Sequence, residues 1–360
     1  MSNTLVLLGA LAAGWIITSL FVPLIARICR SRGWLDRPGP RKLHAHPTPR
    51  LTGIALFLSI WTPLLVAAWL LPTHVAELLP SALPVLIGAV LILMLGIVDD
   101  LHPLSGGVKL GVQAIVGTFL YAVGIGFDRL WIPFVGGVSL GFLSWPVSLF
   151  WFLVLLNAVN IIDGMDGLAV STTAVATLAL VWVSWTHHLP PVALGSVALL
   201  GGLIAFWRYN RPPAVVFMGD SGSLSLGYFF AVVALLVPIK RFTVVAFFVP
   251  ILALLLPVVE AVVTLGRRFL SGANPLGADA GHIHHRLLDL GWSPRRILIT
   301  YNVLAVVLAG FCVGLRYVNR RVLAVGLGFF VLSILAGLGI ILRQRTEGTA
   351  EYRRRTGDEV

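Results

Sequence analysis

The sequence predicts an all-α polytopic integral membrane protein, on three observations. Of the 360 residues, 58% are hydrophobic and 11% are charged, whereas charged residues make up about 25% of an ordinary soluble domain. The mean hydropathy is +0.94. Apolar runs long enough to cross the ~30 Å hydrocarbon core of a bilayer recur along nearly the whole chain. One membrane-embedded helical bundle is therefore expected.

The apolar runs between charged or Pro/Gly-rich breaks predict eleven transmembrane helices. The first run is too long for a signal peptide and has no convincing cleavage site, so it is interpreted as a helix. The fifth and seventh runs are short, which leaves ten helices as an alternative count. The predicted helices cover 4–28, 51–71, 82–98, 109–127, 146–162, 167–187, 191–207, 222–238, 242–265, 297–315 and 322–342.

The charges of the loops predict the orientation of the bundle. Most Arg and Lys residues fall on one side of the membrane, in the loops 29–50, 99–108, 163–166, 208–221 and 266–296 and in the tail 343–360. The positive-inside rule makes this side cytoplasmic and places the N-terminus outside. The whole of 1–342 is expected to form one transmembrane domain, followed by a basic, disordered cytoplasmic tail at 343–360.

Between the fourth and fifth helices, alternating apolar residues around Gly136 and Gly137 predict a small exterior β-hairpin. The formal charge of +11 does not indicate nucleic acid, because topology accounts for most of the basic residues. The two cysteines, Cys29 and Cys312, have no metal-ligand or CxxC spacing, so neither a disulfide nor a zinc site is expected.

Carboxylates gather on the predicted cytoplasmic face. An ionised carboxylate inside a bilayer costs about 2.5–3.5 kcal/mol even on a lenient insertion scale, so its presence calls for a partner. Counting helices brings five such residues to the same side, from helix ends and loops far apart in sequence: Asp99, Asp100, Asp163, Asp166 and Asp220. This gathering predicts a functional site at that face.

Asp99 and Asp100 end the third predicted helix. Because consecutive residues of a helix diverge by roughly 100°, the two carboxylates are expected to have different roles. One suits a proton acceptor and the other a metal or lysine partner. The alternative is a solvated acidic pair, for which the C-terminal end of a helix is an unfavourable place.

The segment NAVNIIDGMDGL carries a polar residue at every third position: Asn157, Asn160, Asp163 and Asp166. A regular α-helix would rotate this row by about 60° per step, so the side chains converge only where the helix breaks. Gly164 and Gly167 supply that break, which membrane proteins tolerate where the backbone lines a cavity. A helix cap with packing asparagines is the alternative interpretation.

In MGDSGSLSLG, Asp220 stands just ahead of a predicted helix. Small residues after it would let backbone N–H groups approach an anion while the carboxylate holds a cation. A simple N-cap is the alternative, since Asp is a preferred cap.

The longest interior loop contains GADAGHIHHRLLDLG, which groups His282, His284, His285 and Arg286. Zinc lacks supporting ligand spacing here, and binding of diphosphate oxygens fits better. A solvated basic loop is the alternative. The first interior loop adds the basic residues Arg41, Lys42, His44 and Arg50, for which topology is a sufficient explanation.

Together, VDD at 98–100, NAVNIIDGMDGL, MGDSGS and HIHHRLLDLG resemble the polyprenyl-phosphate N-acetylhexosamine-1-phosphate transferase family. The likeness is greatest to the branch of UDP-GlcNAc:undecaprenyl-phosphate GlcNAc-1-phosphate transferases, which are related to the phospho-MurNAc-pentapeptide translocases. The motifs appear in the family's order and span most of the chain.

The resemblance implies roles for particular residues. Catalytic roles would fall to Asp99, Asp100, Lys109 and His284, and metal binding to Asp220 and Asn160. Substrate binding would fall to Lys42, Asn157, Asn160, Asp163, Asp166, His282, His285 and Arg286. Ala280 departs from the family, which often has a basic residue there, and this puts one phosphate or sugar contact in doubt.

The implied reaction transfers GlcNAc-1-phosphate from UDP-GlcNAc to undecaprenyl phosphate and releases UMP, as the first membrane step of a cell-surface glycan such as teichoic acid or O-antigen. Mg²⁺ is the implied cofactor, with Mn²⁺ as an alternative. The expected location is the bacterial cytoplasmic membrane with a cytoplasmic active site, and the expected partners are these two substrates, membrane lipid and a second copy in a homodimer, with no nucleic acid.

Three alternative functions share features with this sequence. Another UDP-amino sugar in the same reaction stays open. A CDP-alcohol phosphotransferase fails because Val170 stands where that family's motif needs Arg, and no later Gly-x3-Asp-x3-Asp follows. An ion-coupled transporter fits poorly, because transport sites lie near the membrane midplane whereas these carboxylates crowd one face.

Overall fold

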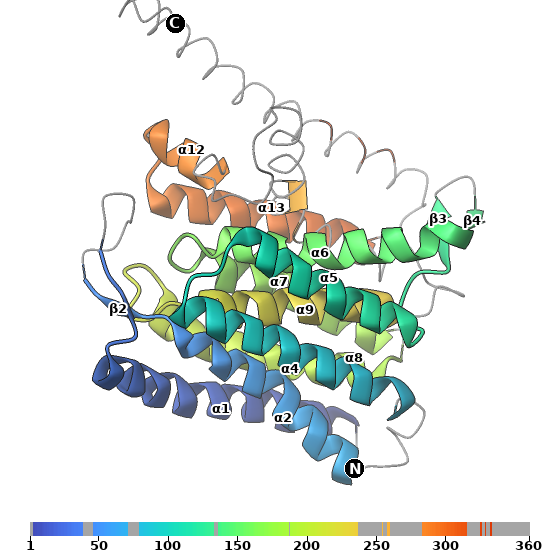
Figure 1. The fold of residues 1–360 in the computed structure, drawn as a ribbon, viewed down its shortest axis with the longest axis horizontal. Coiled ribbons are helices and arrows are strands. Elements are labelled where there is room, and N and C mark those ends of the chain that lie inside the picture. Colours follow the sequence, from blue (N-terminus) through green and yellow to red (C-terminus); the bar gives the residue numbers. More distant parts are fainter. Residues whose placement is uncertain are drawn as a thin grey trace, which may run out of the picture. The chain divides into compact units, whose positions relative to one another are not determined.

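The computed structural model describes residues 3–38, 46–70, 79–132, 136–186, 188–236 and 283–314, together with residues 254, 258–259, 325, 328 and 332. Most of this is helix (Figure 1). Within the described part, eight helices are long and apolar enough to cross a membrane. The all-α polytopic fold predicted from the sequence is therefore confirmed, while the total of eleven helices and the exterior N-terminus stay predictions.

The helices occur in the predicted order. They are α1 (Asn3–Arg32), α2 (Ile54–Leu70), α4 (Leu79–Leu101), α5 (Gly106–Ala122), α6 (Ser144–Ile162), α7 (Leu168–Thr186), α8 (Pro190–Asn210), α9 (Gly219–Leu236), α12 (Ile283–Asp289) and α13 (Pro294–Gly314). The predicted ninth helix, 242–265, and eleventh, 322–342, lie almost wholly outside the described residues.

Several boundaries differ from those predicted. The fourth predicted helix was expected to reach 127, but α5 ends at Ala122, where the chain turns through Gly124 with φ +87°. At 17 residues it falls just below the length of the eight long apolar helices. The eighth predicted helix begins earlier than expected, at Gly219, so Asp220 lies inside the first turn of α9.

Two short antiparallel strand pairs accompany the helices. The predicted hairpin is present as β3 (Arg129–Ile132) paired with β4 (Gly136–Ser139). A second pair, β1 (Leu35–Asp36) with β2 (Thr48–Pro49), was not predicted, because two-residue strands leave no periodic pattern in the sequence. The 3-10 turns η1 (Leu51–Gly53) and η2 (Gly141–Leu143) lead into α2 and α6.

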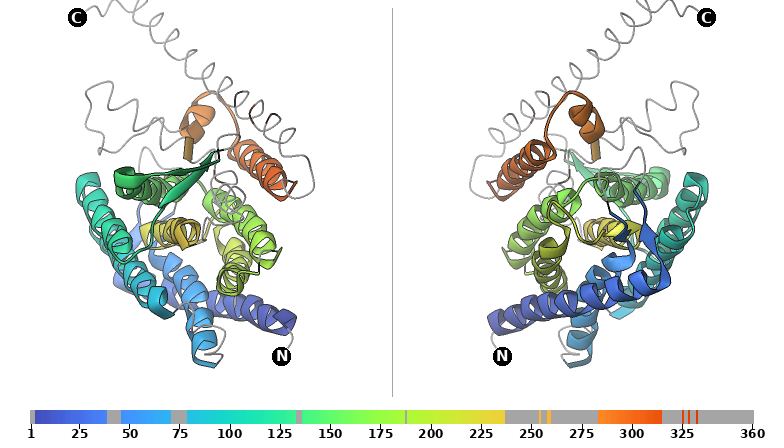
Figure 2. Two further views of the ribbon diagram at one scale, coloured as in Figure 1. Left: turned by 90° about the vertical axis from the view of Figure 1, so that its right-hand side faces the viewer. Right: turned by 90° about the vertical axis from the view of Figure 1, so that its left-hand side faces the viewer.

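The core of the bundle is built around α9, which has 94% of its residues buried inside the protein. It packs against α4, α6 and α2, and Figure 2 shows it surrounded by these helices. Tyr228 of α9, which is 1% exposed, donates a hydrogen bond to the carbonyl of Val85 in α4 at 2.6 Å. This buried polar contact fixes α9 against α4 and so helps to set where its N-terminal end lies.

Small residues allow two other helices to cross closely. A Cβ at Gly14 of α1 would collide with the backbone of Ala198 in α8, and one at Gly201 of α8 would collide with the backbone of Leu11 in α1. Small residues at such crossings are common where helices pack in membranes.

Candidate active site

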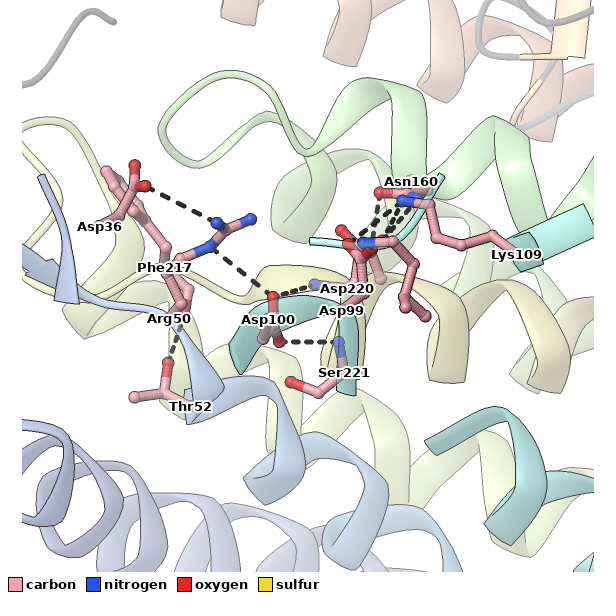
Figure 3. Close-up of polar contacts among 12 residues, drawn as sticks. Asp36, Arg50, Thr52, Asp99, Asp100, Lys109, Asn160, Phe217, Asp220 and Ser221 are labelled. Atoms are coloured by element: carbon pink, nitrogen blue, oxygen red, sulfur yellow. Dashed lines mark hydrogen bonds and ion pairs between the residues drawn. The ribbon is translucent and has the colours of Figure 1, made fainter. Parts of the chain in front are cut away.

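Four helix ends meet at one end of the bundle: the C-terminal ends of α4 and α6 and the N-terminal ends of α5 and α9. Each contributes a polar side chain to one cluster, which consists of Asp99, Lys109, Asn160 and Asp220 (Figure 3). We call these four residues the acid–lysine cluster. The expectation that carboxylates from distant helix ends gather at one face is confirmed for Asp99 and Asp220.

Lys109 lies at the centre of the acid–lysine cluster. Its Nζ donates to Asp220 Oδ2 at 2.8 Å and to Asp99 Oδ2 at 3.2 Å. The lysine side chain is 22% exposed, whereas those of Asp99 and Asp220 are 9% and 11% exposed. One ammonium is thus the cationic partner of two nearly buried carboxylates and balances one of their two negative charges. Such groups are costly to bury without a partner.

Asn160 completes the cluster from the last turn of α6. Its amide nitrogen donates to Asp220 Oδ2 at 3.2 Å, and its carbonyl oxygen accepts from Ser223 of α9 at 3.2 Å. Oxygen and nitrogen of an amide are assigned from such contacts, and rotating the amide would turn the carbonyl oxygen toward Asp220. Asn160 can therefore offer either a donor or an oxygen ligand at this point.

Asp99 and Asp100 diverge as the helical geometry predicts. Besides Lys109, Asp99 accepts from the backbone N–H of Leu104 at 2.8 Å. Asp100 instead accepts from the backbone N–H groups of Asp220 and Ser221 at 2.9 and 3.0 Å. The unfavourable dipole at the C-terminal end of α4 is offset, since one acid faces an ammonium and the other faces the positive N-terminal end of α9.

The predicted break between α6 and α7 is present at residues 163–167. Asp163 lies in it, close to the acidic residues, and burial raises the pKa of its carboxyl well above the usual range. The charges of Asp220 and Asp100 raise it further, and Arg50 and the backbone N–H of Gly219 lower it. Asp163 therefore takes up a proton more readily than an ordinary aspartate.

Two other predicted site residues form hydrogen bonds with other parts of the protein. Asp166 accepts from the backbone N–H of Ala214 at 2.9 Å, which ties the break to the loop between α8 and α9. Asn157 donates to Gln113 of α5 at 2.7 Å and to the carbonyl of Leu153 at 2.8 Å. Both lie near the cluster along the chain, and their substrate-binding roles stay predictions.

Four of the five remaining predicted site residues are not described at the level of side chains. Lys42 and His282 lie outside the described residues, and of His284 and His285 only the backbone is described. The segment that contains them was predicted as a loop, whereas the short helix α12 begins at Ile283 and includes Arg286. Their roles in phosphate binding stay predictions.

Several contacting residues were missed by the sequence analysis. Gln113 is fully buried, lies one turn after Lys109 and faces α6 through its hydrogen bond to Asn157. Ser223 lies one turn after Asp220 and binds Asn160. The sequence could have indicated Gln113 and Ser223, because each is a polar residue in an apolar run and lies one helical turn from a predicted site residue. Asn210, which accepts from Gly167 and donates to Val216, gave no such signal.

The acid–lysine cluster fits a hard divalent cation of the Mg²⁺ type. Such an ion takes oxygen ligands, and in proteins it is commonly held by one or two carboxylates together with waters and substrate phosphates. Asp220 provides a carboxylate and Asn160 an amide oxygen. Among the described residues, no group of three or more His, Cys, Asp and Glu side chains has the geometry of a metal site, and Mg²⁺ stays a prediction.

The sequence matches known proteins over most of its length. The model of glycosyl transferase family 4 matches residues 82–238, the part that holds the acid–lysine cluster. A probable undecaprenyl-phosphate N-acetylglucosaminyl 1-phosphate transferase of Bacillus subtilis is 31% identical over 319 residues, which cover 88% of this chain and 85% of that protein.

Two further relatives cover a similar extent. A decaprenyl-phosphate N-acetylglucosaminephosphotransferase of Mycobacterium tuberculosis is 32% identical over 374 residues, covering 94% of this chain and 90% of that protein. A phospho-N-acetylmuramoyl-pentapeptide-transferase of Clostridium perfringens is 32% identical over 322 residues, covering 84% and 95%. The names of all three describe transferases, and the first two also name a polyprenyl phosphate.

Proposed function

The chain belongs to glycosyl transferase family 4, and on this basis we propose that it transfers an N-acetylhexosamine 1-phosphate from a UDP-sugar to a polyprenyl phosphate. The names of the relatives support this reaction class. The observation that carries the proposal is the acid–lysine cluster, in which Lys109 holds Asp99 and Asp220 together at the end of a membrane bundle.

The finer proposal takes UDP-GlcNAc as donor and undecaprenyl phosphate as acceptor. An oxygen of the lipid phosphate attacks the phosphorus that carries the sugar. The bond from that phosphorus to the bridging oxygen breaks, UMP leaves with this oxygen, and a lipid-linked diphosphosugar remains. This reaction would be the first membrane step of a surface glycan, performed at the cytoplasmic face of a bacterial cytoplasmic membrane.

Phosphoryl transfer needs charge neutralisation and in-line positioning more than covalent help. A phosphate monoester has a second pKa near 6, so the acceptor is mostly dianionic at neutral pH and needs little base strength. Asp99 would orient the acceptor or remove a residual proton. Lys109, which already bridges two carboxylates at 2.8 and 3.2 Å, would place positive charge next to the reacting phosphates.

We also propose that Mg²⁺ is the cofactor, with Asp220 and Asn160 as its protein ligands. When bound, the ion would neutralise phosphate charge and polarise the bond to the leaving group. Asp220 suits this role because it lies in the first turn of α9 and is reached by both Lys109 and Asn160. The three histidines and Arg286 of the segment 282–286 would bind the donor phosphates, with Lys42 as an additional contact.

The experiment is UMP release by the purified protein with Mg²⁺, tested against a panel of UDP-amino sugars and with or without undecaprenyl phosphate. We expect release only with the lipid acceptor and fastest release with UDP-GlcNAc. Preference for UDP-GalNAc or another sugar would correct the donor. Absence of UMP together with ion flux in liposomes would refute the transferase and favour a transporter.

Direct attack by the lipid phosphate is a separate part of the proposal. Incubation of the protein with UDP-GlcNAc labelled in the sugar-bearing phosphate, without lipid acceptor, should leave no label on the protein. Covalent label that transfers to added undecaprenyl phosphate would instead show a phospho-aspartyl intermediate.

A further inference from the structure

Asp100 makes different contacts from its neighbour. Its side chain is fully buried, and its two oxygens accept the backbone N–H groups of Asp220 and Ser221 at 2.9 and 3.0 Å. These N–H groups belong to the first turn of α9, where a helix leaves donors without intrahelical partners. Asp100 of α4 thus accepts the N–H groups that an N-cap side chain next to α9 would otherwise accept. Its carboxylate also places a negative charge at the positive end of the α9 dipole.

The backbone around this contact leaves little room for other arrangements. Gly219 has φ +70°, and a Cβ there would lie 2.5 Å from Asp100 Oδ2. Gly96, one turn before Asp100, faces the same part of α9, since its Cβ would lie 2.5 Å from the Cα of Ser221. The end of α4 and the start of α9 are therefore in close backbone contact (Figure 3).

Arg50 provides the counter-charge of Asp100. Its guanidinium Nε lies 3.7 Å from Asp100 Oδ1, and its other side lies 3.7 Å from Asp36 Oδ1 in β1. The neighbouring backbone is joined to α9 as well, because Phe217 donates to the carbonyl of Pro49 at 2.8 Å and Gly53 donates to that of Met218 at 3.0 Å. The segment 49–53 and the end of α4 thus hold the start of α9 between them.

We propose that Asp100 is a positioning residue, which with Arg50 as its counter-charge fixes the first turn of α9 and so aims Asp220, while proton handling by the acidic pair falls to Asp99 alone. The proposal rests on the proposed transferase function. It follows from the division of contacts within the pair: Asp99 reaches Lys109, the cation that Asp220 also binds, whereas Asp100 is occupied by backbone donors and Arg50.

The first test compares three single variants by UMP release. Asp100→Asn keeps one side-chain oxygen for the helix end, so we expect a loss of about tenfold, equivalent to ~1.4 kcal/mol, and a higher Mg²⁺ concentration for half-maximal rate. Asp99→Asn removes the carboxylate that would orient the acceptor or take its residual proton, and it breaks the ion pair with Lys109. We therefore expect the larger loss, about 10²-fold. Asp36→Asn is the matched control, because the Asp36 carboxylate lies 3.7 Å from the same guanidinium but belongs to β1 rather than to α4. Its rate should stay within about twofold of wild type.

The second test is a cycle of Arg50→Gln, Asp100→Asn and the double variant. Arg50→Gln leaves the buried charge of Asp100 without its cation, which is more damaging than removing both partners. The double variant should therefore recover the rate and the Mg²⁺ requirement of Asp100→Asn alone, a rescue that a catalytic Asp100 would not allow. Independent, multiplicative effects of the two substitutions would overturn the proposal.

Two further outcomes are decisive. If Asp100→Asn has the rate of Asp99→Asn and an unchanged unfolding temperature, Asp100 acts in the chemistry and the proposal is wrong. If the wild-type protein releases no UMP, the proposed function is refuted, and the same cycle measured by thermal unfolding still tests the pairing. Additive losses of unfolding temperature would then overturn it, and rescue in the double variant would support it.

Discussion

The structure allows the effects of removing the Lys109 ammonium on stability and rate to be predicted in detail. Lys109→Met keeps most of the side-chain volume and removes the ammonium, which lies 2.8 Å from Asp220 and 3.2 Å from Asp99. Removing one partner of a buried ion pair typically costs about 3–5 kcal/mol. Because the lysine is 22% exposed and water can enter, the low end, ~3 kcal/mol, is expected without divalent cation.

The response to Mg²⁺ makes this prediction specific. If Asp220 binds Mg²⁺ as proposed, the ammonium and the cation would compete for the same oxygen, Asp220 Oδ2. The variant should then bind Mg²⁺ more tightly even though it is less stable. A ligand that binds the folded state stabilises it by RT ln(1 + [L]/Kd). The rise in unfolding temperature on adding Mg²⁺ should therefore be larger for Lys109→Met than for wild type.

The assay is thermal unfolding of the detergent-purified protein in EDTA and in a series of Mg²⁺ concentrations, accompanied by UMP release. We expect the rate to fall by about 10²–10³, the usual effect of removing one electrostatic donor from a reacting site. Lys109→Arg is the control, because it keeps the charge. Equal Mg²⁺-induced shifts in Lys109→Met and wild type would refute the reasoning that the ammonium and the metal share Asp220.

Three other variants test separate parts of the site. Gly219→Ala should lower the rate of UMP release by at least about tenfold, because alanine at φ +70° costs about 1–2 kcal/mol and its Cβ would displace Asp100. Gly111→Ala on α5, with open space around it, is the control and should keep the wild-type rate. Equal rates for the two variants would contradict this account. Asn160→Ala should raise the Mg²⁺ concentration for half-maximal rate by about tenfold, and an unchanged requirement would remove Asn160 from the metal site. Asp163→Asn should flatten the dependence of stability on pH. Since the folded protein raises the pKa of the Asp163 carboxyl, the stabilisation is complete below the ordinary pKa and is lost as pH rises through the folded value; unfolding temperatures that fall equally with pH in variant and wild type would contradict it.

Features set by local pattern could be predicted from the sequence. The apolar runs gave most helices within a few residues, and Gly164 and Gly167 marked the break between α6 and α7. The gathering of Asp99 and Asp220 at one end followed from counting helices, and the separate contacts of Asp99 and Asp100 followed from the helical rotation. These inferences succeed because lipid permits few structures for an apolar segment.

Contacts between distant segments could not be predicted in this way. Arg50 appeared only as one basic residue in a cytoplasmic loop, yet it faces Asp100, and nothing in the local sequence pairs the two. Asp100 also accepts a hydrogen bond from the backbone of α9, 120 residues away, a contact for which the local sequence gives no signal. The hydrogen bonds of Asp166 to Ala214 and of Asn157 to Gln113 were not predicted either, and the substrate-binding roles of both residues stay predictions. Such pairings depend on how helices pack, which hydrophobic periodicity does not encode.

The most direct test of the account is UMP release by the wild-type protein and by Asp220→Asn, measured with UDP-GlcNAc, undecaprenyl phosphate and a range of Mg²⁺ concentrations. Asp220 is contacted by both Lys109 and Asn160 and is the proposed metal ligand. The account predicts Mg²⁺-dependent release by wild type and none by the variant, which should still unfold cooperatively. Release by Asp220→Asn at the wild-type rate and ordinary Mg²⁺ would show that the reaction occurs elsewhere.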